Sequence, residues 1–277
     1  MTHEAIIRFA IFASVLGALA VWELRAPRRQ QTLGRGPRWP SNLGVVALDT
    51  LLVRLLLPTT AVGLALVCEA RGWGLFQVVA LPAWVTIPFA FLAMDLAIYL
   101  QHAMFHAVPA LWRLHRMHHA DQDIDVTTGV RFHPIEILLS MGIKFGVIAA
   151  LGPPAIAVLL FEIALNATSM FNHSNIVMPL WVDRVLRWIV VTPDMHRVHH
   201  SIVVRETNSN FGFNLPWWDR LFGTYRDQPA AGHDGMTIGI SQFRQQEEQR
   251  LDRMLSQPLR DDTRDYPLGR SQADKHS

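Results

Sequence analysis

Residues 95–119 read DLAIYLQHAMFHAVPALWRLHRMHH, and this stretch decides the fold. Residues four apart lie on one face of a helix, so His102 and His106 can hold the same metal ion. In the following His-Arg-Met-His-His run, positions i, i+3 and i+4 share a face and the Arg points away. The stretch therefore predicts helices that carry a histidine-rich metal site.

The same pattern, His-Arg-x-His-His, occurs at 115–119 and again at 196–200. The second copy also has a plausible helix start. Thr192 can cap the helix, Pro193 suits its first position, and Asp194 lies in the first turn, where the helix dipole favours negative charge. We expect a short helix that presents three imidazoles on one face.

Three of the 13 histidines, His3, His233 and His276, stand apart and are given no role. Imidazole suits iron, zinc, copper and nickel, and ten histidines exceed the about four to six donors that one such ion accepts. A site with two ions is therefore predicted. Two adjacent irons can reduce O₂, whereas zinc has no redox chemistry. The predicted ligands are His102, His106, His115, His118, His119, His133, His173, His196, His199 and His200.

The composition indicates a membrane protein. Half of the 277 residues are apolar, 17% are charged, and the mean hydropathy is +0.18, whereas a soluble domain carries about a quarter charged residues. A net charge of +2 is too small to imply a nucleic-acid partner. The single cysteine, Cys68, excludes an internal disulfide and a cysteine-based metal site.

A membrane-spanning helix needs about 20 mostly apolar residues. Spans are predicted at 6–22, 51–68 and 74–94, and a helical hairpin at 135–171 is broken by the turn Gly152-Pro-Pro154. We expect an all-α, polytopic membrane protein. It would have four or five transmembrane or re-entrant helices and a cytosolic helical cap that carries the dinuclear metal site.

The loop after the first span indicates the orientation. It contains five arginines and no acidic residue among them, which is typical of a cytoplasmic loop. The topology then places every histidine cluster, and hence the active site, on the cytoplasmic side of an integral, multi-pass membrane protein. The five arginines are Arg25, Arg28, Arg29, Arg35 and Arg38.

At these residues the chain resembles the fatty acid hydroxylase superfamily, also called the sterol desaturase family. Its histidine boxes HxxxH, HxxHH and HxxHH are matched at 102–106, 115–119 and 196–200. His133, within an R-x-H-P-x-E segment, and His173, before the last box, match two further histidines of the family. The segments 206–213 and 217–225 resemble the part that follows the last box. The resemblance covers roughly 95–225.

The resemblance implies an oxidoreductase that uses O₂ and two iron ions (Fe²⁺/Fe³⁺) to hydroxylate or desaturate a membrane lipid, such as a fatty acyl chain or a sterol-like lipid. No glycine-rich dinucleotide fingerprint occurs, so we expect a separate electron donor: a reductase, ferredoxin or cytochrome. The expected parts are N-terminal transmembrane helices (1–94), a catalytic domain (95–225) and a polar C-terminal tail (226–277). The tail is expected to be loosely ordered or helical on the surface.

Metal-bound histidines usually donate their second N–H to a carboxylate or carbonyl group. The predicted partners of the ligand histidines are Asp95, Asp125, Glu136, Asn166 and Asp194. An alternative is a membrane metal-binding or transport protein that uses the same cluster, although transport sites usually lie at the bilayer midplane. A zinc hydrolase is disfavoured because no H-E-x-x-H motif occurs.

Overall fold

The computed structural model describes residues 2–79, 81–260 and 266. Within these residues the chain is helical, with two isolated β-bridges and no strand. Five apolar stretches are long enough to cross a membrane: 4–25, 39–78, 83–107, 134–151 and 155–173. The prediction of an all-α chain with four or five such helices is confirmed.

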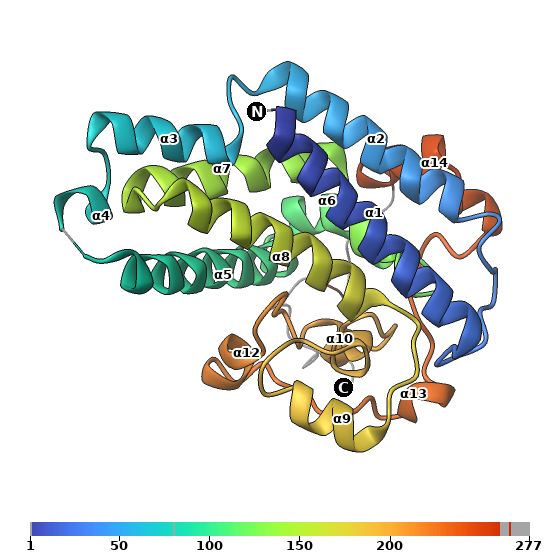
Figure 1. The fold of residues 1–277 in the computed structure, drawn as a ribbon. Coiled ribbons are helices and arrows are strands. Elements are labelled where there is room, and N and C mark those ends of the chain that lie inside the picture. The colour runs from blue at the N-terminus through green and yellow to red at the C-terminus, as the bar shows by residue number, and fades with distance from the viewer. Residues whose placement is uncertain (1, 80, 261–265, 267–277) are drawn as a thin grey trace, which may run out of the picture.

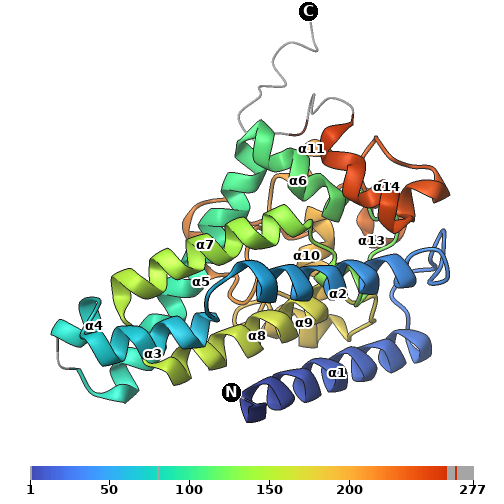
Figure 2. The same ribbon diagram turned by 90° about the horizontal axis from the view of Figure 1, so that it is seen from above.

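Helix α1 (Thr2–Arg25) packs along α8 (Ala155–His173) (Figure 2). The second apolar stretch consists of α2 (Trp39–Leu56), α3 (Ala61–Arg71) and the short α4 (Leu75–Val78). The prediction of one helix over 51–68 is wrong, because the chain breaks between α2 and α3. Pro58 lies in this break, and the Thr60 hydroxyl caps α3 by accepting a hydrogen bond from Gly63 N.

Helix α5 (Ala83–Ala107) begins just after Pro82. The predicted span of 74–94 is therefore displaced: its first residues form the separate short helix α4, which ends at Val78, and α5 continues well past Met94. As a result His102 and His106 lie on the last two turns of the membrane helix itself. The first histidine box is rigidly attached to the apolar bundle.

The predicted hairpin is confirmed by α7 (Pro134–Leu151) and α8. Gly152 ends α7 with a φ of 59°, and an added Cβ there would lie 2.1 Å from the carbonyl oxygen of Trp73. Only glycine fits this turn. The hairpin and α5 surround an apolar core to which Met94, Ile148 and Phe161 contribute.

Shorter helices gather at one end of the bundle, and α9, α10, α12 and α13 lie together beyond the C-terminal end of α8 (Figure 1). Helix α6 follows α5 directly and carries the second histidine box. The bounds are α6 (Pro109–His119), α9 (Leu180–Leu186), α10 (Pro193–His199), α11 (Val204–Thr207), α12 (Trp217–Leu221), α13 (Gly232–Gly235) and α14 (Leu251–Ser256), with 3₁₀ turns at Thr128–Val130, Gln246–Gln249 and Gln257–Leu259.

Arg35 and Arg38, two of the five arginines that suggested a cytoplasmic loop, form ion pairs within the protein. Arg38 is 0% exposed, and its guanidinium lies 2.5 Å from Asp121 and 2.6 Å from Asp125. Arg35 lies 3.0 Å from Glu23. Because these charges are paired with acidic residues of the protein, they report on packing and carry less information about the membrane side than the sequence suggested.

The C-terminal segment is folded onto the bundle as far as residue 260. Helix α14 packs against α2 and buries Met254, and Gln249 and Gln257 are also buried. Tyr266 stacks on Trp112 with ring centroids 5.5 Å apart. The tail was expected to be loosely ordered or helical on the surface. Its described part contains short helices and is more deeply packed than a surface tail.

Candidate metal centre

Nine of the ten predicted ligands converge into two groups, and every one of the nine is buried. Within each group one ligand atom from each residue lies within 4.8 Å of all the others. The five-histidine group consists of His102, His106, His115, His119 and His199, and the four-histidine group of His118, His173, His196 and His200.

The repeated His-Arg-x-His-His pattern explains how two groups form side by side. In the first copy, His115 and His119 enter the five-histidine group, whereas His118 enters the four-histidine group. The second copy reverses the allocation, since His196 and His200 join the four-histidine group and only His199 joins the other. Each copy therefore contributes to both groups. Helix α10 begins as predicted, with the Thr192 side chain accepting a hydrogen bond from Met195 N.

Backbone carbonyls determine the orientation of several rings. A carbonyl oxygen only accepts, so the Nδ1 that contacts it carries the proton, and the Nε2 of a neutral ring then holds a lone pair. The four donations are His102 Nδ1 to Phe211 O (2.7 Å), His118 Nδ1 to Arg131 O (3.2 Å), His173 Nδ1 to Ser169 O (2.7 Å) and His199 Nδ1 to Ser209 O (2.7 Å).

The inward nitrogens fit metal ions. Nε2 of His118 lies 3.0 Å from Nε2 of His173, and both hold lone pairs, which repel unless a cation lies between them. Two nitrogens bound at right angles to one ion, each at about 2.1 Å, would be about 3.0 Å apart. Further buried ring nitrogens without a hydrogen-bond partner among the described residues are His106 Nε2, His119 Nδ1 and Nε2, His199 Nε2, and His200 Nδ1 and Nε2.

Burial also keeps the rings uncharged. It lowers the pKa of His115 from 6.5 to about 3. Burial, with a further contribution from neighbouring rings, lowers the pKa of His118, His119, His199 and His200 well below 6.5. Neutral imidazole is the form that binds transition metals. The site is therefore in its metal-binding form at neutral pH.

These shifts predict a pH dependence. The folded rings have pKa values below 6.5, the ordinary value of an exposed imidazole, so the unfolded chain binds more protons as the pH falls. Their stabilising contribution is complete above about pH 6.5 and is lost progressively below it. We expect thermal denaturation in detergent to occur at lower temperature at pH 5 than at pH 7.5, with earlier release of metal. An unchanged midpoint across this range would contradict a cluster of neutral histidines.

Of the five predicted partners, Glu136 is the one that contacts a histidine of the two groups. Its Oε1 lies 2.7 Å from Nδ1 of His115, at the start of α7. The carboxylate accepts a hydrogen bond from Nδ1–H, which leaves the lone pair of His115 Nε2 facing Nε2 of His102 at 3.1 Å. Glu136 thus fixes the orientation of one ligand.

We expect Glu136→Gln to weaken metal binding by about 10- to 100-fold, because an amide holds His115 in place less firmly than a carboxylate does. The measurement is metal retention during titration with a chelator. The matched control is Glu247→Gln, which makes the same change at an exposed position. Equal retention in wild type and Glu136→Gln would remove Glu136 from this role.

Asp95 does not contact a histidine, contrary to prediction. Its two carboxylate oxygens accept hydrogen bonds from Asn214 Nδ2 and Trp218 Nε1, each at 2.8 Å. Because Asn214 and Trp218 belong to the segment after the last box, Asp95 anchors that segment to α5. The carbonyl of Phe211, in the same segment, is the group that orients His102.

Three further predicted partners also bind other groups. Asp125 accepts from Arg38 and Trp39, Asn166 Nδ2 donates to the carbonyl of Glu162 one turn earlier in α8, and Asp194 pairs with Arg197. In each case a nearer partner on the same or an adjacent element satisfies the side chain. These residues shape the elements that carry the histidines and do not contact the rings in the two groups.

His133 stands outside both groups, although it was predicted as a ligand. Its Nδ1 accepts a hydrogen bond from Ile135 N at 3.2 Å and caps α7, and its Nε2 faces the carbonyl of Leu255 at 3.3 Å. Both ring nitrogens are therefore engaged by the backbone, which leaves no lone pair for a metal ion.

Two supporting residues were not predicted. The Asn208 Oδ1 lies 3.1 Å from Nδ1 of His106, and Asp219 accepts from Phe211 N and Gly212 N, both at 2.8 Å. Asp219 thereby positions the carbonyl that binds His102. The only sequence signal was the family-like segment 206–225, in which both residues lie.

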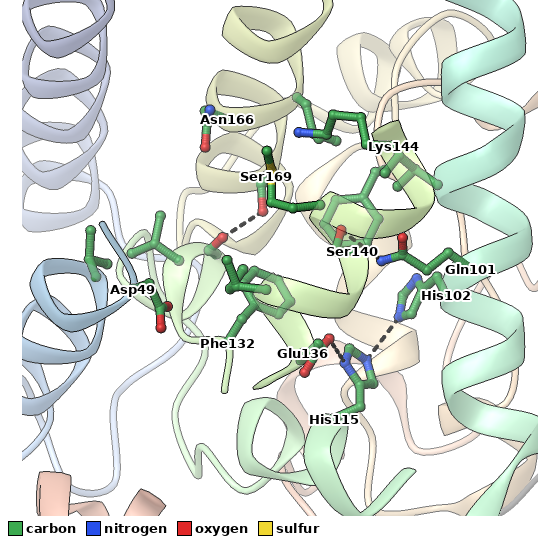
Figure 3. Close-up of a pocket in the computed structure, with 18 of the residues that line it drawn as sticks. Asp49, Gln101, His102, His115, Phe132, Glu136, Ser140, Lys144, Asn166 and Ser169 are labelled. Carbon is green, nitrogen blue, oxygen red and sulfur yellow. Dashed lines mark hydrogen bonds and ion pairs between the residues drawn. The ribbon is translucent and has the colours of Figure 1, made fainter. Parts of the chain in front are cut away.

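An internal cavity of about 240 Å³ opens onto the five-histidine group. Helices α1, α2, α5, α7 and α8 line it, mainly with apolar side chains such as Phe12, Phe132 and Phe213. Figure 3 shows His102 and His115 at one end of the cavity, Lys144 and Asn166 toward the other. The arrangement can enclose an apolar chain and place part of it beside two of the histidines.

Comparison with known proteins agrees with this site. Residues 87–224 match the family described as fatty acid hydroxylase. The chain is 32% identical over 147 residues to the ornithine lipid hydroxylase OlsE of Rhizobium tropici, covering 53% of this chain and 43% of the relative. It is 30% identical over 178 residues to the alkylglycerol monooxygenase of Xenopus tropicalis, covering 62% and 38%, respectively.

The human alkylglycerol monooxygenase is 29% identical over 157 residues, which cover 56% of this chain and 34% of the relative. The aligned parts therefore span about two fifths or less of the length of these relatives. No solved structure gives a significant match to the chain.

Proposed function

Because residues 87–224 belong to the fatty acid hydroxylase family, we propose that the protein is an O₂-dependent oxidoreductase that hydroxylates or desaturates a membrane lipid. The observation that carries this proposal is the apolar cavity that ends on His102 and His115. A cavity between membrane helices receives its substrate from the bilayer, and the metal-binding groups lie at its end.

The two histidine groups would each hold one iron ion. Such ions, when bound, supply the redox chemistry that activates O₂ and oxidises a C–H bond. The chain's own contribution is structural: Glu136 and the carbonyls that bind the rings hold the ligands in place, and burial keeps the ligands neutral. The apolar lining excludes water and directs one part of a lipid chain toward His102.

The catalytic domain in this proposal is 95–225, to which the N-terminal helices 1–94 add one wall of the cavity through α1 and α2. The segment 226–277 is the polar C-terminal tail of this proposal. The active site would face the cytoplasm, where a separate reductase, ferredoxin or cytochrome supplies electrons. Fatty acyl and sterol-like lipids are candidate substrates, and the relatives add ornithine lipids and alkylglycerols to the lipids to be screened.

A membrane transport protein for metal ions is the alternative. The burial of all nine histidines disfavours it, since transport needs a site that opens to each side in turn. Four of the nine rings instead donate hydrogen bonds to backbone carbonyls, which fix their orientation.

The test is turnover with labelled oxygen. The purified, iron-loaded protein in lipid vesicles would be given ¹⁸O₂, a chemical reductant and lipid mixtures that include an alkylglycerol and an ornithine lipid. We expect an ¹⁸O-labelled alcohol, or a product with one more double bond, by mass spectrometry. The alternative would be favoured if the iron-loaded sample incorporated no label, formed no double bond and moved metal ions across the vesicle membrane.

A further inference from the structure

The cavity beside the metal centre contains hydrogen-bond acceptors that lack donors. Three of its lining residues have a buried side-chain oxygen with no hydrogen-bond partner among the described residues: Asp49 Oδ1, Gln101 Oε1 and Glu136 Oε2. An unsatisfied buried acceptor costs free energy, and more so inside a membrane protein. Glu136 is partly satisfied through His115, so Asp49 and Gln101 are the two acceptors that remain unexplained.

Asp49 is the more unusual of the two. It lies on α2, is 8% exposed and forms no ion pair with any residue that the structure describes. The nearest cation on the cavity wall, Lys144, is already paired with Glu162 at 2.7 Å, and Glu162 also binds Arg8 at 2.5 Å. Among the described residues, no cation pairs with the Asp49 carboxyl group.

Gln101 completes a polar band across the cavity. Its Nε2 donates to Ser140 Oγ at 3.0 Å, which orients the amide and leaves Oε1 without a donor. Figure 3 places Asp49 on one side of the cavity and Gln101 with Ser140 on the other, while His102 follows Gln101 directly on α5. A molecule that donates to this band lies next to the five-histidine group.

We propose that the cavity binds a lipid with a hydrogen-bond-donating group, a hydroxyl or an ammonium, which donates to one of the two unpaired acceptors, Asp49 or Gln101. This inference rests on the proposed function and identifies the class of its substrate. A plain hydrocarbon chain and an ionised carboxylate headgroup have no proton to donate, so both leave the two acceptors unsatisfied. Since Gln101 adjoins His102, the oxidised carbon lies close to the donor group and far from the end of the chain.

The test compares lipids that differ only in the donor. The probes are a long-chain alcohol, the amine of the same chain length, and the methyl ether of the alcohol, which lacks a donor. Binding to the full-length protein in nanodiscs is measured by native mass spectrometry, so the result does not depend on turnover. We expect the alcohol or the amine to bind about 10- to 100-fold more tightly than the ether.

Two variants locate the effect. Asp49→Leu should reduce this preference at least severalfold. Asp49→Asn distinguishes a hydroxyl donor from an ammonium donor, because it keeps an acceptor for the alcohol but loses the carboxyl group that can pair with the ammonium of the amine. The control is Leu51→Ala, an exposed position on the same helix. Gln101→Leu provides a second test should Asp49→Leu fail to fold.

Equal binding of all three probes by the wild-type protein would overturn the inference, as would an unchanged preference in both Asp49→Leu and Gln101→Leu. These outcomes differ from failure of the proposed function, which would appear as selective binding of the donor lipid without any oxidation in the iron-loaded protein.

Discussion

Replacing His118 with Ala is expected to lower the metal content from about two ions per chain to about one and to abolish lipid oxidation. His118 is one of only four ligands of its group, and its Nε2 lies 3.0 Å from that of His173. Its loss leaves three donors and an open position. Elemental mass spectrometry of the purified variant, together with the turnover assay, measures both effects.

His133→Ala is the informative comparison, because the family resemblance marks His133 as a ligand whereas the structure uses it to cap α7. We expect this variant to keep about two ions and to be less stable through loss of the cap. Loss of an ion from His133→Ala, or retention of both ions by His118→Ala, would show that the ions are not bound by the two groups as assigned.

Arg38→Met is expected to destabilise the protein by about 3–5 kcal/mol, because it removes the cation that two buried carboxylates share. Asp121 then keeps only the more distant Arg131, at 3.8 Å. Arg38 contacts both Asp121 and Asp125, and it also donates to the Thr128 hydroxyl at 3.2 Å. The loop that these residues form directly follows the second histidine box. The variant should therefore also bind metal less tightly.

Thermal denaturation in detergent measures this effect, with Arg54→Met as the matched control. Arg54 lies in the last turn of α2, the helix whose N-cap position Arg38 occupies, and it is exposed, so its replacement should change stability by about 0.5 kcal/mol or less. If both variants denatured at the wild-type temperature, the network around Arg38 would not be stabilising the fold.

The sequence predicted which histidines come together, because helical spacing is a local property. The i, i+3 and i+4 pattern determines which imidazoles share a face, and it held for both His-Arg-x-His-His copies. His133 lies outside both groups for the opposite reason: it precedes α7, outside any helical repeat, and only the tertiary contact with Leu255 reveals where its ring lies.

The partners of the ligand histidines were mostly missed. Four of the rings are oriented by backbone carbonyls, which leave no trace in side-chain composition. Asp95 was chosen because it lies two turns before His102, but a donor from a distant segment, Asn214, reaches it first. Such long-range competition cannot be derived from spacing along one helix.

The bounds of the membrane helices show a similar limit. Hydropathy located the apolar stretches, and the glycine and prolines at 152–154 correctly predicted the hairpin. It did not separate α2 from α3, because both sides of Pro58 are equally apolar. Nor did hydropathy show that α5 extends to Ala107 and carries the first histidine box within it.

The central claim is that nine buried histidines hold two redox-active ions. Metal content per chain, measured by elemental mass spectrometry on protein purified anaerobically in detergent without added metal, tests it most directly. We predict about two irons per chain. A well-folded sample without bound metal would contradict the claim, and two tightly bound zinc ions would contradict its redox chemistry while leaving the two histidine groups intact.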